Sequence, residues 1–356
     1  MLSTYKYINH KLEFVQNFVH YIFGEIWMKS HANVPYSFSL FKHKHYHKLI
    51  SNLYVSNSET SDRFCVLVET IYNIISQYSD IQKSDVKRFY QINTNISQLC
   101  TDKRIQPVSY DDLTRFDQNL SSNIKKFYDL LYGSGSILGL KEILEISNFK
   151  DHYKKFKEKN SNICLCCGIQ KLETVKEYRS DYDHFLPKSI YPFISINLMN
   201  LVPTCERCNQ KFKNTKDPLL DEGNRRRKVL YPYEEIDYNL NIEVCINDFS
   251  QGCRIEPENI GISFNSDKLS DEEINTWCSL YSIIDRYQSL CSFDDDGLRW
   301  IEDARNAMKR DNSTFSDYLN AQKEIYHDSK LKFPFFENRF IQIPFLEACL
   351  QYGILS

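Results

Sequence analysis

The chain has 356 residues, of which 42% are hydrophobic and 26% charged, as in globular proteins rather than disordered or fibrous ones. The length allows two or three domains of ordinary size. The formal net charge of −3 excludes a uniformly basic nucleic-acid coat protein, so any anionic partner must bind a local patch. Ten glycines and ten prolines are few for this length and favour helices joined by short loops.

No stretch of sequence has the roughly 18 consecutive apolar residues that a membrane helix requires. The aromatic-rich segment 12–27 is interrupted by Glu13, His20 and Glu25, which the core of a signal peptide would not contain. We therefore expect a cytoplasmic protein with no membrane contact.

The first part of the chain, residues 1–160, is predicted to form a helical domain that senses a signal, binds a partner or mediates self-association. Apolar residues recur there at helical spacing in four segments. Ser61 and Asp62 are candidate caps of the second helix, and the glycine- and serine-rich segment 133–136 is predicted to be flexible. The four segments are 14–25, 64–78, 110–132 and 141–159.

The last part, residues 223–356, is predicted to contain strands and then helices. Apolar and polar residues alternate over 241–249, which indicates a strand. Ser270 and Glu273 have the spacing of a capping box, which predicts a helix that begins there and continues to Tyr287. The expected fold class is α+β and mainly helical.

Between these parts, residues 161–222 are predicted to form a small module held by zinc. Four of the twelve cysteines occur there as two Cys-x2-Cys pairs. Two intervening residues let a tight turn direct both sulfurs to one ion, and two such turns supply a closed tetrahedral zinc site. The other eight cysteines are interpreted mainly as small buried residues, since disulfides are not expected in the cytoplasm. The predicted structural zinc ligands are Cys164, Cys167, Cys205 and Cys208.

The insert between the two pairs carries the residues that suggest chemistry. It contains an Asp-His dipeptide, Asp183-His184, and Asn200 sixteen residues after the histidine, while Asn209 directly follows the second pair. This order resembles that of HNH nucleases over residues 164–218. It is similar to the zinc-stabilised ββα-metal fold, in the variant whose third motif residue is Asn rather than His.

The resemblance implies a metal-dependent endonuclease that hydrolyses phosphodiester bonds. His184 is the expected general base, since imidazole titrates near neutral pH. Asp183 and Asn209 are the expected ligands of a catalytic Mg²⁺ or Mn²⁺, which would polarise the phosphate. Asn200 is expected to orient the strand that carries His184, although an asparagine there could also simply cap a turn. Adjacent strand residues point to opposite faces, so Asp183 and His184 share one site only if the strand ends or twists there.

The segment from Cys205 onward is the expected α-helix of the ββα fold, with Thr204 as a candidate N-cap. On an α-helix, Asn209, Lys213 and Lys216 share one face. Six basic residues are predicted to contact nucleic-acid phosphates, with solvated lysines and a solubilising loop as the alternatives. These residues are Lys211, Lys213, Lys216, Arg225, Arg226 and Arg227.

Proteins that resemble this one are common in bacterial restriction and anti-phage defence, often beside an ATPase. The resemblance thus implies DNA as the substrate, an ATPase or sensor protein as a partner, and self-association as a further option. One ββα core cuts one strand, so a double-strand break needs a second copy or repeated nicking. Two alternatives stay open: an RNA-cleaving enzyme with the same core, and a non-catalytic zinc module that binds nucleic acid or a partner protein.

Two other clusters are interpreted without a function. His43 and His47 are four residues apart but have no cysteine or acidic partner nearby in sequence, so both are expected on the surface. The acidic segment 294–297 lacks the alternating ligands of a calcium loop and is predicted to be a turn. The chain contains no P-loop sequence and is not expected to be an ATPase itself.

Overall fold

The computed structural model describes residues 3–56, 58–132, 149–173, 182–236, 238–248, 254–329 and 335–354. These residues are mainly helical and contain two short two-stranded antiparallel sheets, which confirms the expected α+β class. The predicted flexible segment 133–136 and the first half of the predicted helix 141–159 lie outside the described residues.

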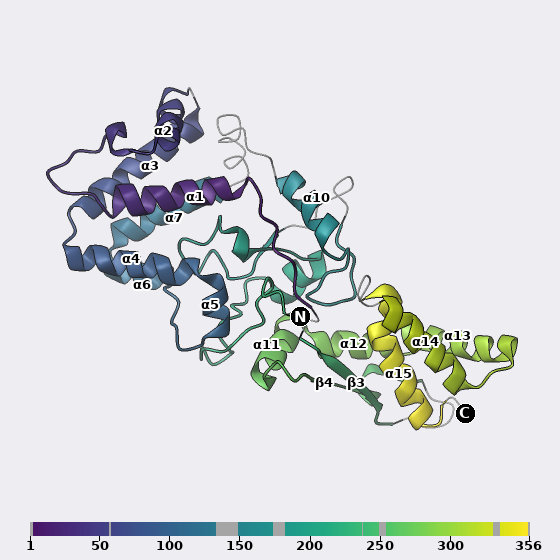
Figure 1. Ribbon diagram of the computed structural model, residues 1–356. Coiled ribbons are helices and arrows are strands. Elements are labelled where there is room, and N and C mark those ends of the chain that lie inside the picture. Colours follow the sequence, from purple (N-terminus) through teal and green to yellow (C-terminus); the bar gives the residue numbers. More distant parts are fainter. Residues whose placement is uncertain are drawn as a thin grey trace.

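The amino-terminal part is a group of helices (Figure 1). Its hydrophobic core is rich in aromatic side chains. Trp27 lies near their centre, fully buried, with its ring 5.2 Å from that of Phe127 and its indole nitrogen donating to the carbonyl of Val68. The helices are α1 (Glu13–Tyr21), the π-helix η1 (Ile22–Trp27), η2 (Phe38–Leu40), α2 (Lys44–Val55), α3 (Glu59–Ser76), α4 (Asp80–Thr94), α5 (Ile96–Thr101), α6 (Tyr110–Phe116) and α7 (Gln118–Tyr132).

Two sequence predictions in this part need correction. The helix expected over 110–132 is broken at Asp117, whose carboxylate accepts from the Leu120 amide and from the Tyr78 hydroxyl. The predicted caps Ser61 and Asp62 are wrong, because α3 begins at Glu59 and both residues lie in its first turn. An acidic residue in that turn interacts favourably with the helix dipole, which explains Asp62 there without a capping role.

The carboxy-terminal part joins a β-hairpin to helices. Strands β3 (Asn241–Ile246) and β4 (Ile260–Asn265) pair along their whole length, and helices α12 and α15 contact them. The predicted capping box is confirmed, with the Ser270 amide 3.0 Å from a Glu273 carboxylate oxygen. The helix expected to continue to Tyr287 is interrupted at Ser282, which has a left-handed φ of 48°. The helices are η5 (Pro257–Asn259), α11 (Asp271–Tyr281), α12 (Ile283–Cys291), α13 (Asp296–Asp311), α14 (Phe315–Ser329), η6 (Phe336–Asn338) and α15 (Arg339–Gln351).

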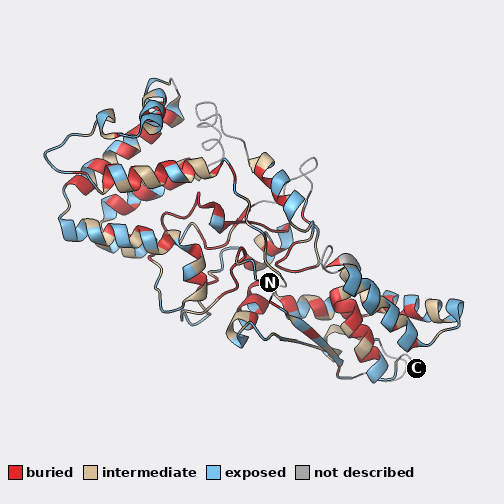
Figure 2. Ribbon diagram, viewed as in Figure 1, coloured by how far each residue is buried: buried red, intermediate tan, exposed pale blue. Residues whose placement is uncertain are grey.

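The region between these parts has little regular structure yet is well buried (Figure 2). The described residues form two hydrophobic cores, one mainly amino-terminal and one mainly carboxy-terminal. The central region contributes to both, since Leu201 packs into the first core and Val202 into the second. The amino-terminal segment also crosses the molecule, where the Tyr5 amide donates to the carbonyl of Pro232. Contacts distant in sequence therefore fix the central region. Among the described residues, we find no helix with the length and apolar character of a membrane span.

Candidate active site and metal centre

Four cysteines form a buried cluster suited to a metal ion. Their sulfur atoms all lie within 4.8 Å of one another. Four thiolates at this separation match the tetrahedral ligand shell of a structural zinc ion, which binds sulfur at about 2.3 Å. The predicted set is confirmed as a potential metal centre and consists of Cys164, Cys167, Cys205 and Cys208.

A tight turn brings the first pair of sulfurs together. The carbonyl of Cys164 accepts from the amides of Cys167 and Gly168, at 3.2 and 2.8 Å. Gly168 ends the turn with a φ of 69°. This conformation is least unfavourable for glycine, because glycine has no Cβ atom. Cys166, between the pair, is buried but does not belong to the cluster, and its carbonyl accepts from the Trp277 indole at 2.7 Å.

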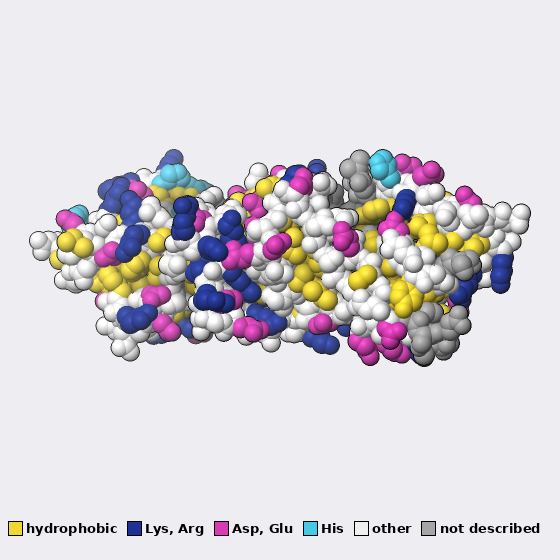
Figure 3. Space-filling model, turned by 90° about the horizontal axis from the view of Figure 1, so that it is seen from below, with side chains coloured by type: hydrophobic (Ala, Val, Ile, Leu, Met, Phe, Trp, Pro, Cys, Tyr) yellow, Lys and Arg dark blue, Asp and Glu magenta, His cyan; other side chains and the backbone are white. Residues whose placement is uncertain are grey.

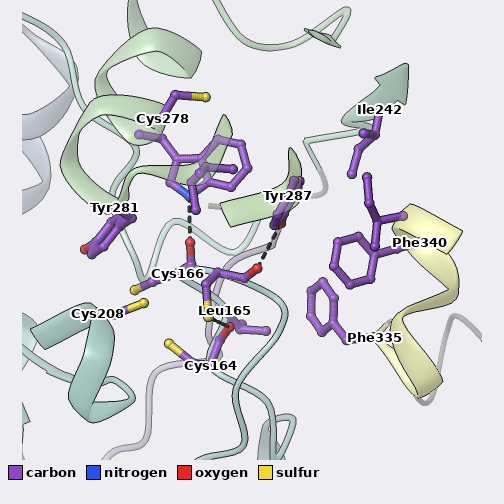
Figure 4. Close-up of a cluster of buried hydrophobic side chains, with 14 of the residues drawn as sticks. Cys164, Leu165, Cys166, Cys208, Ile242, Cys278, Tyr281, Tyr287, Phe335 and Phe340 are labelled. Carbon is purple, nitrogen blue, oxygen red and sulfur yellow. Dashed lines mark hydrogen bonds between the residues drawn. The ribbon is translucent and has the colours of Figure 1, made fainter. Parts of the chain in front are cut away.

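Side chains from helices α11 and α12 surround the cysteines (Figure 4). The Tyr287 hydroxyl donates to the Cys167 carbonyl at 2.8 Å. Arg286 Nη1 lies 3.3 Å from the sulfur of Cys208, and its guanidinium stacks over the ring of Phe212 at 4.5 Å. Zinc with four thiolates has a formal charge of −2, so Arg286 offsets half of it. Sequence reasoning missed Arg286, because no motif connects it to cysteines so far away in the chain.

The predicted order of two strands and a helix is present beside this cluster. Strand β1 (Tyr182–His184) pairs antiparallel with β2 (Leu201–Pro203), placing Asp183 opposite Val202. The short helix η3 (Leu198–Asn200) leads into β2, and the helical segment η4 (Arg207–Lys213) follows it.

The expected α-helix is instead a π-helix. The Asn214 amide donates to the carbonyl of Asn209, five residues earlier, rather than to that of the fourth residue. Thr204 is not its cap, because its hydroxyl is buried with no hydrogen-bond partner and the helix starts after Glu206. A π-helical turn is wider than an α-helical one, so the face predicted from α-helical spacing does not apply.

Asn200 fixes the loop that follows β1. Its side chain is fully buried and makes two hydrogen bonds to one residue, accepting from the Leu186 amide at 2.8 Å and donating to its carbonyl at 3.0 Å. The carbonyl of Asn200 also accepts from the Phe185 amide at 2.8 Å. The chain just after His184 is therefore tied to β2 through a single asparagine.

His184 lies at the end of β1 with a largely buried ring. Its Nε2 atom is 2.9 Å from the carbonyl of Ser195, and its ring meets that of Tyr132 edge-on at 4.4 Å. Burial, together with the ammonium groups of Lys188 and Lys213, lowers the pKa of His184 to about 4, against the opposing effect of the Ser195 carbonyl. Because a carbonyl only accepts, the neutral ring carries its proton on Nε2, which leaves Nδ1 free to accept one.

Asp183 points from β1 toward η4, where it meets Lys213. Lys213 Nζ lies 2.9 Å from Asp183 Oδ1 and 2.9 Å from the carbonyl oxygen of His184. The two charged side chains are only 1% and 5% exposed. Lys213 is therefore not on the surface as predicted for a phosphate-binding residue. The η4 backbone and the buried carboxylate direct it inward.

The structure separates the Asp183 carboxylate and the His184 ring onto two sides of the strand. Strand β1 does end at His184, but Asp183 faces η4 while His184 faces helix α7 through Tyr132. Lys213 contacts both residues, the first through its carboxylate and the second through its carbonyl. Lys213 is thus a common neighbour of the two residues, while the Asp183 carboxylate and the His184 ring contact different parts of the protein.

Asp183 and Asn209 each present an oxygen donor of the kind that a divalent cation prefers. Asp183 Oδ2 is buried and has no hydrogen-bond partner, which is unusual for a carboxylate and suits a hard cation. Burial raises the pKa of Asp183, although the Lys213 ammonium opposes this. Asn209 is half-buried, lies one helical turn before Lys213, and makes no side-chain hydrogen bond to a described residue.

The remaining predicted phosphate-binding residues divide into exposed and structural ones. Lys211 and Lys216 are exposed, and so is Arg225, which pairs with Asp221 at 2.9 Å. The prediction that Arg226 binds phosphates is wrong. Its guanidinium is half-buried and donates to several backbone carbonyls, among them that of Leu99 at 2.7 Å. The carbonyls are those of Leu99, Asp102, Ile105, Leu219 and Arg227.

Lys216, Arg225 and Arg227 line a groove of about 900 Å³ beside helix α11. Acidic residues share this groove, so its charge is mixed. Figure 3 likewise shows Lys and Arg side chains gathered toward one end of the face seen from below, interspersed with Asp and Glu. The acidic residues are Asp217, Asp221, Glu222 and Glu272.

Of the two clusters interpreted without a function, the histidines behave as expected. His43 and His47 are exposed, and His47 Nδ1 contacts the carbonyl of Phe38 rather than a metal-binding group. The turn predicted at 294–297 is confirmed only for 294–295, because helix α13 begins at Asp296. Of the eight scattered cysteines, those in the described residues are buried except Cys245.

Comparison with known proteins gives one partial likeness. A stretch of 67 residues, 18% of this chain, is 42% identical to part of the Septu protein PtuB of Bacillus thuringiensis. The matched stretch is 25% of that protein, so the chain spans about a quarter of the relative's length. No protein-family model matches the chain, and no solved structure matches it.

Proposed function

We propose that this chain is a metal-dependent HNH endonuclease that hydrolyses DNA in bacterial anti-phage defence. The observation that carries the proposal is the buried Asp183 Oδ2 atom without a partner, on a strand that ends in a neutral histidine and lies beside a four-cysteine cluster. The partial likeness to a Septu protein supports the defence role.

In this proposal the His184 imidazole is the general base. A pKa of about 4 keeps the ring neutral at physiological pH, so Nδ1 is able to take a proton from the attacking water. The Ser195 carbonyl holds the ring in that tautomer and orientation. Asn200 acts as a positioning residue, because its two bonds to Leu186 fix the chain that follows His184.

Asp183 and Asn209 would hold a Mg²⁺ or Mn²⁺ ion. When bound, that ion would supply the positive charge that stabilises the phosphate and the departing oxygen. The four cysteines would hold zinc in a structural role, since all four ligand positions are taken by protein and none is left for substrate. Cys208 directly precedes Asn209, so the zinc centre would also fix the start of η4.

The exposed residues Lys211, Lys216 and Arg225 would contact DNA phosphates at the surface. An ATPase or sensor protein of the same defence system is the proposed partner, and the helical region 1–160 is the proposed contact site. We also propose that the expected domain limits hold, so that the nuclease module covers 161–222 between the regions 1–160 and 223–356.

The decisive experiment compares the wild-type chain with His184→Ala on plasmid DNA, in Mg²⁺ and in EDTA. We expect a loss of at least about 100-fold in nicking rate, as for removal of a general base. The control His47→Ala changes an exposed histidine and should nick like wild type. Zinc content and melting temperature should be the same in all three proteins.

Matched DNA and RNA substrates in the same assay decide the substrate class. Cleavage confined to RNA would replace DNA in the proposal. Nicking by His184→Ala at the wild-type rate would overturn the catalytic role and favour a non-catalytic zinc module.

A further inference from the structure

Lys213 and Asp183 form a buried ion pair that carries no net charge. The ammonium lies 2.9 Å from Asp183 Oδ1, and both side chains are almost fully buried. A buried pair interacts strongly, because little water screens the two charges. The carboxylate is therefore neutralised from within the protein before any divalent cation binds.

Other groups near this pair add little net charge. The His184 ring faces Tyr132 and the Ser195 carbonyl rather than the pair, and the buried Tyr281 hydroxyl makes no hydrogen bond to a described residue. Lys188 and Asp217, which interact with His184 and Lys213, carry opposite charges that offset each other. The zinc centre contributes a formal charge of −2, of which Arg286 offsets one unit. A divalent cation on Asp183 Oδ2 would leave a positive charge uncompensated in this buried region, which is unfavourable.

We propose that Lys213 makes cation binding at Asp183 depend on the simultaneous binding of a phosphodiester. The cation adds two positive charges, and the zinc centre together with Arg286 adds one negative charge, so one positive charge is left beside the neutral Lys213–Asp183 pair. One phosphodiester carries the single negative charge that balances it. The inference rests on the proposed nuclease function and adds an order of assembly to it. The cation and the nucleic acid bind weakly alone and tightly together, and each raises the affinity for the other by the same factor.

The test measures the affinity for Mn²⁺ by electron paramagnetic resonance of the free ion. It uses the full zinc-loaded chain carrying His184→Ala, so that a short DNA duplex stays uncleaved. We expect the duplex to tighten Mn²⁺ binding by about tenfold or more, a coupling of ordinary size for two linked sites. Lys213→Gln added to this protein should bind Mn²⁺ at least about tenfold tighter without DNA, and DNA should then add little.

Two further variants make the result specific. Lys309→Gln removes an exposed lysine of helix α13, far along the chain from Lys213, and should behave like its parent. Asp183→Asn should abolish Mn²⁺ binding with and without DNA. If Asp183→Asn leaves Mn²⁺ binding unchanged, Asp183 is not a ligand, and the proposed function fails together with this inference.

If Asp183→Asn abolishes binding but Lys213→Gln leaves the DNA-free affinity unchanged or weaker, only the role of Lys213 is overturned. Lys213→Gln removes a buried charge, so its fold is checked by melting temperature and zinc content. Should that variant not fold, Lys213→Met, which keeps a long buried side chain without the charge, takes its place with the same expected result. In the parent protein, a duplex that leaves the Mn²⁺ affinity unchanged contradicts the proposal.

Discussion

Arg286 Nη1 lies 3.3 Å from the sulfur of Cys208, which brings helix α12 into the immediate surroundings of the metal-binding cysteines. The same guanidinium stacks on Phe212 of η4. One side chain from the carboxy-terminal part thus contacts both the cysteine cluster and the helix that carries Asn209. The central module is therefore not independent of the residues that follow it.

Replacing Arg286 should weaken zinc retention. Arg286→Met keeps much of the apolar packing on Phe212 but removes the charge that offsets the thiolates. We expect zinc to be released to a chelator about 10 to 100 times faster, as for other groups that support metal ligands. Arg310→Gln, at an exposed arginine of α13, should release zinc at the wild-type rate. Equal release from both variants would show that Arg286 does not support the centre.

Substitutions at Asn200 and Asn209 should have different effects, the first on stability and the second on activity. Asn200→Ala leaves the buried amide and carbonyl of Leu186 without partners, so we expect a loss of about 2–4 kcal/mol in the free energy of unfolding. Asn209→Ala removes no hydrogen bond to a described residue and should change stability by less than about 0.5 kcal/mol. In the proposed function it should still lose Mg²⁺-dependent nicking. Urea unfolding and the plasmid assay measure the two effects, and equal stability losses would contradict this division.

Substitutions at the neighbouring residues Arg225 and Arg226 should also have different effects on stability. Arg226→Ala deprives several backbone carbonyls of their donor, and we expect it to cost about 2–4 kcal/mol in urea unfolding. Arg225→Ala, at an exposed ion pair, should leave stability within about 0.5 kcal/mol of wild type. It should weaken DNA binding more at low salt than at high salt, as expected for a phosphate contact. A stable Arg226→Ala protein would exclude the structural role of that guanidinium.

His152 should make the protein sensitive to mild acid. It is buried on α10 (Phe149–Lys159), and its Nδ1 contacts the hydroxyl of Tyr182 in strand β1. Burial, together with His10 and Lys155, lowers the pKa of His152 to about 4, against the opposing effects of the Ile8 carbonyl and Asp151. The unfolded chain takes up this proton near pH 6.5, so the folded state loses stability as the pH falls from there toward 4.

Between pH 7.5 and 5 this effect amounts to about 2 kcal/mol. His152→Gln should lose that much less of its unfolding free energy over the same interval, as measured by urea unfolding at both values. His47→Gln, which changes an exposed histidine, should keep the wild-type pH dependence. The same dependence in His152→Gln and wild type would show that another group is responsible.

Local sequence features were sufficient for part of the site. The Cys-x2-Cys pairs gave the four buried cysteines, and the capping box gave the start of α11. The resemblance to HNH nucleases implied the order of strand, strand and helix around Asp183 and Asn209, and the structure has this order. These features depend on residues a few positions apart, whose relative geometry the backbone restricts by itself.

Features that depend on distant contacts could not be predicted in this way. The sequence presents Lys213 and Arg226 as two of six similar basic residues, yet Lys213 pairs with Asp183 on a distant strand and Arg226 binds carbonyls near residue 100. No sequence motif links Arg286 to Cys208, whose sulfur it contacts.

The sequence alone determined which thiols and oxygen donors are present and in what local geometry. Only the tertiary structure decided which cations remain at the surface and which neutralise buried thiolates and carboxylates. The physical reason is that the free energy of a charged side chain depends on the water and the opposite charges around it. Both are set by the packing of segments that lie far apart in the chain.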